Sequence, residues 1–131
     1  MKGYTSNVEK ETINNKNFRK VAYTSHYMQL VYMTLKPGED IGMERHASDQ
    51  FFRIEEGEGD CIIDGIKHKI KDGFGIIVPS NAEHNIVNTS KSKSLSLYTI
   101  YALPNHKDGI VAATKEKAES MKEYFDGKVS E

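Results

Sequence analysis

The sequence predicts an all-β protein, a sandwich or a barrel, and three observations carry this prediction. Short segments rich in β-branched and aromatic residues recur along the chain. Glycine and proline stand between these segments, where they mark turns. An Asp-Gly pair also lies between two apolar runs, as in a β-hairpin. The expected strands are Met28–Leu35, Gln50–Ile54, Asp60–Ile63, Ile66–Ile70, Ile76–Val78 and Leu95–Tyr101.

The hairpin is centred on Asp64-Gly65, with the run Cys61–Ile63 before it and Ile66–His68 after it. Both central residues of a two-residue type I′ turn need positive φ, which Asp and Gly tolerate. Glu56–Gly59 marks a second turn, because its two glycines interrupt the apolar pattern.

The C-terminal part of the chain changes to a helical pattern. Thr114 is suited to an N-cap position, and Lys115–Phe125 follows it. Three apolar residues in this stretch recur at intervals of three and four: Ala118, Met121 and Phe125. The segment 114–126 is therefore expected to form one amphipathic helix on the outside of the barrel.

The remaining stretches complete a single domain over residues 1–131. Residues 1–17 are polar and weakly patterned, so we expect an N-terminal arm or an edge strand there. Residues 18–103 hold the expected strands and form the barrel. A chain of 131 residues suits one core of this size.

Composition and charge exclude several classes of protein. Eighteen Lys+Arg against 19 Asp+Glu leave a net charge of −1, which argues against a dedicated nucleic-acid binder. No aliphatic run, such as Ile76–Val78, approaches the length of a membrane span. No secretory leader is read at the N-terminus. The single cysteine, Cys61, excludes an internal disulfide and suits a reducing compartment, so a cytoplasmic location is expected.

The residues suited to metal binding lie in the middle of the sequence. Glu44 and His46 are two apart, so on a strand they would project from the same face. Gln50 has the same parity, and His84 follows a proline turn that could return it to the same interior. Two imidazoles, one carboxylate and one amide oxygen suit Mn, Fe, Co, Ni or Zn and are a poor set for Ca.

These residues carry a resemblance to the cupins. Cupins share a first motif, G-x5-H-x-H-x(3,4)-E-x6-G, and a second motif, G-x5-P-x-G-x2-H-x3-N. The first motif has its spacing here from Gly38 to Gly57, and the second from Gly73 to Asn88. Asn81 replaces the glycine of the second motif. Two spaced motifs in the right order form a far more specific signal than one short pattern.

The resemblance implies a double-stranded β-helix, or jelly-roll barrel, that holds one divalent transition metal. The positions of the cupin ligands fall on Glu44, His46, Gln50 and His84. Glu44 stands where the first histidine is usual, and Gln50 where the glutamate is usual, so the formal charge of the set is retained. The alternatives are a barrel of similar shape with a metal-free polar mouth, and a Gln50 that orients water or substrate without binding metal.

Two strand tyrosines are candidates for the pocket. Alternate residues face inward, so either Tyr98 or Tyr101 is expected to point into the barrel, not both. An inward tyrosine would donate a hydrogen bond or assist proton transfer, or it would simply pack in the core. Glu44 and Tyr101 are taken as the candidate catalytic residues.

The other polar candidates are expected to have no part in the site. His26 and His68 lie among surface-type neighbours and are expected in solvent. His106 follows the last long strand and is expected in a surface loop. Cys61 is expected to pack in the core, and Arg45 to point outward.

The resemblance implies a metal-dependent enzyme that acts on a small oxygenated metabolite, by sugar isomerase- or epimerase-like or lyase chemistry. A metal-dependent dioxygenase and a non-catalytic small-molecule-binding module are the alternatives. Cupins commonly pair through sheet edges or exchanged N-terminal arms, so a homodimer is also expected.

Overall fold

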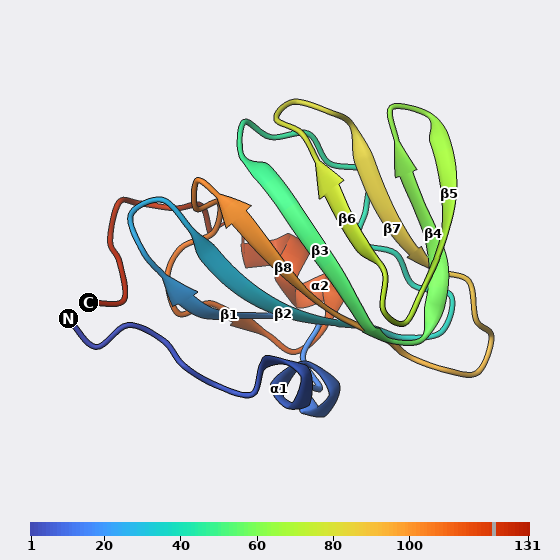
Figure 1. Ribbon diagram of the computed structural model, residues 1–131, viewed down its shortest axis with the longest axis horizontal. Coiled ribbons are helices and arrows are strands. Elements are labelled where there is room, and N and C mark those ends of the chain that lie inside the picture. The colour runs from blue at the N-terminus through green and yellow to red at the C-terminus, as the bar shows by residue number, and fades with distance from the viewer. Residues whose placement is uncertain (122) are drawn as a thin grey trace.

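The computed structural model describes residues 1–121 and 123–131 as two facing β-sheets, with helices near both ends of the chain (Figure 1). The larger sheet has the order β6-β3-β8-β2-β1-β9, and the smaller has the order β5-β4-β7. Neighbouring strands are antiparallel throughout. This is the expected all-β jelly roll. The strands are β1 (Arg19–Thr24), β2 (Gln29–Leu35), β3 (Asp49–Glu56), β4 (Glu58–Ile63), β5 (Ile66–Lys71), β6 (Gly75–Val78), β7 (His84–Asn88), β8 (Leu95–Ala102) and β9 (Val111–Ala112).

The period-2 pattern of the strands determines which side chains enter the barrel. In β3 the inward residues are Gln50, Phe52 and Ile54, all buried, while Phe51 and Arg53 between them are partly exposed. The hydrophobic core also takes buried side chains from the smaller sheet and from β8: Cys61, Ile70, Ile86, Leu95, Leu97 and Tyr101. The space between the sheets is thus apolar, and the polar inward residues gather at one end.

The predicted hairpin is present between β4 and β5. Asp64 and Gly65 have φ angles of 45° and 81°, as a type I′ turn requires. At the second predicted turn, Gly57 has a φ of 99° and lies between β3 and β4, where the chain passes from the larger sheet to the smaller.

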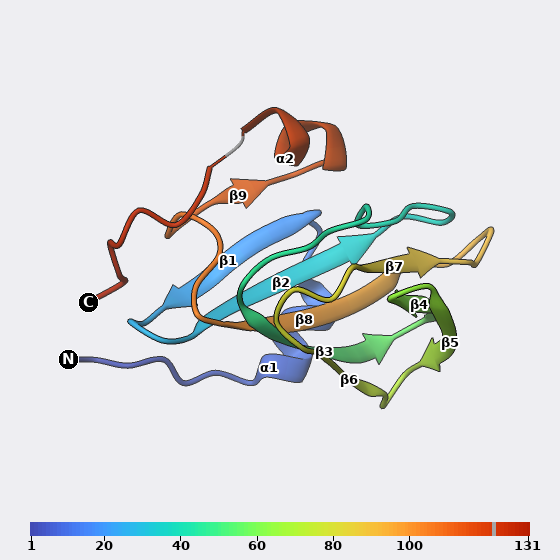
Figure 2. The ribbon, with the colours of Figure 1, turned by 90° about the horizontal axis from the view of Figure 1, so that it is seen from above.

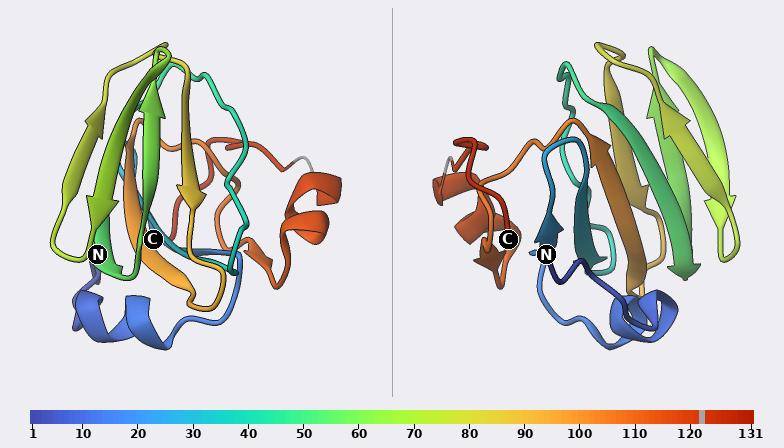
Figure 3. Two further views of the ribbon diagram at one scale, coloured as in Figure 1. Left: turned by 90° about the vertical axis from the view of Figure 1, so that its right-hand side faces the viewer. Right: turned by 60° about the vertical axis from the view of Figure 1, so that its left-hand side comes forward.

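The segment 36–48, which joins β2 to β3, runs beside β7 (Figure 3, left). Asp40 forms an isolated antiparallel bridge with Val87, and Glu44 forms another with His84. Ile41 N–H also donates to the carbonyl of Ile86. The segment therefore extends the smaller sheet without forming a regular strand, although Glu44 and His46 were expected on one.

The N-terminal stretch differs from the expected arm or edge strand, because it contains the helix α1 (Val8–Asn14). Asn7 caps this helix by accepting a hydrogen bond from the Lys10 N–H at 3.1 Å, and acidic residues occupy the first turn. Thr12 is fully buried, so α1 packs against the barrel. A seven-residue helix is marginal by itself, and this packing is what stabilises it.

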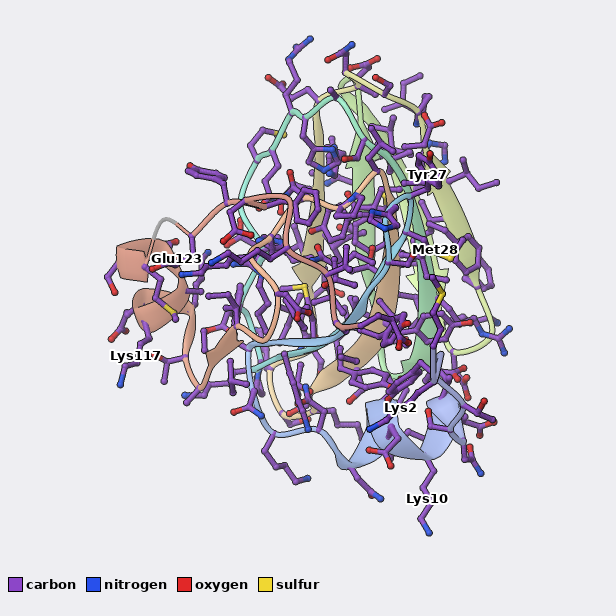
Figure 4. The ribbon with its side chains drawn as sticks, turned by 90° about the vertical axis from the view of Figure 1, so that its left-hand side faces the viewer. Lys2, Lys10, Tyr27, Met28, Lys117 and Glu123 are labelled. Atoms are coloured by element: carbon purple, nitrogen blue, oxygen red, sulfur yellow. The ribbon has the colours of Figure 1, made fainter. Side chains whose placement is uncertain are left out.

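The C-terminal helix is present but shorter than expected. Figure 2 shows α2 (Lys115–Met121) beyond β9 at the side of the larger sheet. The expected helix 114–126 includes Lys122, which lies outside the described residues, and Tyr124, which instead forms a bridge with His106. Lys117 and Glu123 mark this flank in Figure 4. Among the helices of the described residues, none has the length and hydropathy of a membrane span.

Gly59 permits the close contact between β4 and β7. An added Cβ would lie 2.1 Å from the carbonyl oxygen of Val87, so the strands would have to separate. We expect Gly59→Ala to lower the free energy of unfolding by about 3 kcal/mol, measured by urea denaturation. The matched control is Gly75→Ala, whose Cβ would meet only the movable ring of Phe51, at 3.1 Å. Equal losses in the two variants would contradict this account.

Candidate metal centre

The four residues predicted as ligands come together at one end of the barrel interior. One ligand atom from each of Glu44, His46 and His84 lies within 4.8 Å of the other two. Gln50 Oε1 lies 2.8 Å from His46 Nε2 and 3.1 Å from His84 Nε2. The two imidazole rings are 4.9 Å apart and nearly perpendicular.

Backbone pairing brings these side chains together from three segments. Glu44 N–H donates to the His84 carbonyl at 2.8 Å, and His84 N–H donates to the Glu44 carbonyl at 2.9 Å. Asn81 N–H donates to the His46 carbonyl at 2.8 Å. Asn81 has a φ of 68°, a left-handed conformation that Asn tolerates better than most residues, so it can occupy the usual glycine position of the motif.

Each histidine is oriented by a backbone carbonyl. His46 Nδ1 lies 3.2 Å from the carbonyl oxygen of Ser48, and His84 Nδ1 lies 2.9 Å from that of Ala82. A carbonyl oxygen only accepts hydrogen bonds, so each Nδ1 carries the proton. The lone pair of each neutral imidazole is then on Nε2, toward Gln50, as in histidine that binds a metal.

The chemistry of this donor set fits a cation. The Gln50 amide NH2 donates to the Thr99 hydroxyl at 2.8 Å, which directs Oε1 toward the two Nε2 atoms. Three lone pairs therefore meet with the carboxylate of Glu44 beside them. Without a metal, the amide must turn its NH2 toward the rings, or the adjacent imidazoles must both take a second proton. A divalent cation satisfies all four groups at once.

A cavity of about 410 Å³ opens next to these residues. Glu44 and His46 line its inner end, and Ala118 and Met121 of α2 line its outer end. This size suits a small metabolite. A larger hollow of about 810 Å³ contains none of the four predicted ligands, so it is separate from this chemistry.

The inner wall of the site includes a polar cluster that the sequence did not predict. His106 was expected in a surface loop, but it is buried, and its Nε2 lies 3.2 Å from the Tyr101 hydroxyl. Gln29 holds this loop, because its Oε1 accepts from the backbone N–H groups of Asn105 and His106 and its NH2 donates to the His106 carbonyl. No local pattern around His106 signals its contacts with Gln29, which lies far away in the sequence.

Tyr101 is the inward tyrosine. It is buried, and its ring lies 5.4 Å from that of His46, whereas Tyr98 packs beside Phe51 on the outer face. Burial, and after it the charge of Glu44, raises the pKa of Tyr101 well above its usual range. The side chain is therefore a neutral phenol that can donate a hydrogen bond.

His26, His68 and Cys61 lie away from the site, as expected, whereas Arg45 lines the cavity beside Glu44 and His46. His26 and His68 are exposed. Arg45 is also exposed, and it donates to the Asn81 carbonyl at 3.0 Å. Cys61 is buried, and burial raises the pKa of its thiol to about 11, so it remains protonated and packs as a core residue.

Burial, and after it the charge of Arg19, lowers the pKa of His106 to about 3. His106 thus stays neutral in the folded protein, whereas in the unfolded chain it takes a proton below about pH 6.5. As the pH falls from 6.5 toward 3, protonation of His106 in the unfolded chain therefore lowers the free energy of unfolding by up to about 1.4 kcal/mol per pH unit.

We expect His106→Gln to remove this contribution, so that the unfolding free energy falls less steeply from pH 7 to pH 5 than in the wild type. The difference should approach about 2 kcal/mol at pH 5. Urea titrations of chelator-treated proteins would measure it without a contribution from metal release. Identical pH slopes would contradict the assigned burial of a neutral His106.

Known proteins resemble this chain in sequence and in fold. The family model for the cupin domain matches residues 31–101. The uncharacterized protein L612 of Acanthamoeba polyphaga mimivirus is 41% identical over 110 residues, which is 81% of this chain and 69% of L612. YrkC of Bacillus subtilis is 39% identical over 124 residues, 89% of this chain and 66% of YrkC. The chain thus spans about two thirds of the length of these relatives.

A shorter similarity links the chain to dimethylsulfoniopropionate lyase DddW of Ruegeria pomeroyi. The two are 37% identical over 51 residues, 39% of this chain and 34% of the lyase.

Solved structures share the fold. BH2720 from Bacillus halodurans has a TM-score of 0.88 and 36% identity, and the alignment covers 91% of this chain and 95% of BH2720. Salicylate 1,2-dioxygenase of Pseudaminobacter salicylatoxidans, at 17% identity and a TM-score of 0.54 over 58% of this chain and 21% of the dioxygenase, shares the fold alone. Because the cupin model spans more than half of the chain and L612 is similar over most of it, the protein belongs to the cupin family.

Proposed function

We propose that this cupin is a metal-dependent enzyme that acts on a small oxygenated metabolite, such as a sugar or a keto acid. The observation that carries the proposal is the convergence of Gln50 Oε1, two imidazole Nε2 atoms and the Glu44 carboxylate beside a cavity of about 410 Å³. Such a set leaves room for substrate oxygens next to the protein ligands.

Glu44, His46, Gln50 and His84 would hold one divalent transition metal: Mn, Fe, Co, Ni or Zn. When bound, the metal supplies Lewis-acid polarisation of a substrate carbonyl or hydroxyl. This is the chemistry on which isomerases, epimerases and many lyases depend.

The chain's own groups would move and hold protons around the substrate. Tyr101 presents a neutral hydroxyl, so it can donate a hydrogen bond to a substrate oxygen. Glu44 is the carboxylate among the candidate metal ligands and is the candidate to take a proton. The short similarity to the lyase DddW supports lyase chemistry among the classes considered.

Two other functions remain as alternatives. Salicylate 1,2-dioxygenase has the same fold, so a metal-dependent dioxygenase is one. A non-catalytic module that binds a small molecule is the other. A turnover screen of the metal-loaded protein, with and without oxygen, distinguishes all three. A cytoplasmic homodimer is part of the same proposal, and size-exclusion chromatography with light scattering tests the dimer.

The metal content of the purified protein tests the proposed site. We expect elemental analysis of protein purified without added metal or chelator to find one transition metal, and the double variant His46→Ala/His84→Ala to lose it together with any activity. The matched control replaces the exposed histidines, His26→Ala/His68→Ala, and should keep the metal. An unchanged metal content in the His46/His84 variant would refute the site.

Gln50 provides a sharper test of direct ligation. If its oxygen binds the metal, Gln50→Glu should tighten metal binding by adding charge, and Gln50→Leu should weaken it about 10- to 100-fold. Competition against a fluorescent chelator would measure both affinities. If both variants bind more weakly than the wild type to a similar degree, Gln50 only orients its neighbours.

A further inference from the structure

Arg19 has a position that the proposed metal site alone does not explain. It is the first residue of β1, and on this strand it shares a face with the buried Val21. Its side chain is only 11% exposed and lines the cavity beside Glu44, His46 and His106. A guanidinium therefore lies next to the candidate metal ligands, inside the barrel.

Among the described residues, none accepts a hydrogen bond from this guanidinium. Its Nε is buried without a partner, and the nearest carboxylate oxygen, that of Glu44, is 3.9 Å from Nη2. Arg53 Nε is also buried without a hydrogen-bond partner, but it forms a close ion pair with a Glu55 oxygen 3.1 Å away. A buried Nε–H without an acceptor is costly to the fold, so the guanidinium is expected to bind an acceptor from outside the chain, on the side that faces the cavity.

The charges around Arg19 restrict the chemical class of that acceptor. Two guanidinium groups, of Arg19 and the more exposed Arg45, line this part of the cavity with one carboxylate, that of Glu44, so it favours an anion. Tyr101 and His106 beside it are neutral. The lining of the same cavity, however, also includes Glu119 and Glu123 of the C-terminal segment. Glu123 lies beside α2 in Figure 4. These glutamates disfavour a phosphate dianion more than a monoanion.

We propose that Arg19 binds the carboxylate of the ligand, and that the ligand is a small 2-hydroxy or 2-oxo monocarboxylate. A guanidinium forms paired hydrogen bonds with a carboxylate. The neighbouring hydroxyl or oxo group of the same molecule is then within reach of the candidate metal ligands, because Arg19 and Glu44 are 3.9 Å apart. The second contact rests on the proposed metal function, whereas the contact with Arg19 does not. Of the substrates considered above, this selects the acids over neutral sugars.

Binding of lactate, pyruvate and the neutral analogue lactamide, measured by isothermal titration calorimetry, tests the proposal. The wild type should bind both acids at least tenfold more tightly than lactamide. Arg19→Gln should lose at least tenfold in affinity for the acids and little for lactamide. Arg19→Lys keeps the charge but not the paired donors, so its affinity for the acids should lie between those of the wild type and Arg19→Gln. The matched control is Lys20→Gln, a charge removed from the exposed face of the same strand.

Metal content is measured for every sample, so the two proposals can fail separately. The role of Arg19 would be overturned, whatever the metal content, by equal affinities for lactate and lactamide or by the absence of acid binding. Stronger binding of inorganic phosphate than of the acids, or an unchanged affinity of Arg19→Gln for the acids, would also overturn it. If the wild type holds no metal, the metal function fails, while acid selectivity that is lost in Arg19→Gln still supports Arg19. If Arg19→Gln does not fold, Arg19→Lys and the wild-type preference for acids decide the question.

Discussion

The backbone pairing of Glu44 with His84 is the constraint on which the site depends. Two reciprocal hydrogen bonds, of 2.8 and 2.9 Å, hold an irregular segment against the first residue of β7. This pairing brings a carboxylate and an imidazole together although they are far apart in the sequence. Gln50 enters from the facing sheet, so the candidate site lies where both sheets and the segment 36–48 meet. The apolar packing behind it keeps these three parts in register.

The sequence predicted the features that depend on local conformation or on fixed spacing. The Asp64-Gly65 turn could be read from two residues, because a type I′ turn restricts which residues fit. The convergence of the four candidate ligands could be expected from the resemblance of the motif spacing to that of the cupins. The helix at Val8–Asn14 also had a local signal, the capping Asn7 followed by acidic residues, although the segment was interpreted as an arm.

What could not be predicted depends on contacts between distant parts of the chain. His106 follows the last long strand and looks like a loop residue, yet Gln29, on β2, binds its backbone and keeps it buried. The C-terminal helix ends early, and Tyr124 beyond it pairs with His106. Arg19 is one of many basic residues in the sequence, and only the fold separates it from Lys20 on the opposite face. Periodicity within one segment carries no information about such partners.

The arrangement of the candidate ligands has a consequence for folding. They come from the segment 36–48, from β3 and from the start of β7, so no single hairpin contains them. An ion bound there would act as a cross-link between both sheets, closing loops that the unfolded chain must otherwise close at an entropic cost. Because His84 reaches the other three ligands only through the fold, the complete site exists only in the folded protein. The free energy of unfolding would then depend on the concentration of free metal, even in a variant without catalytic activity.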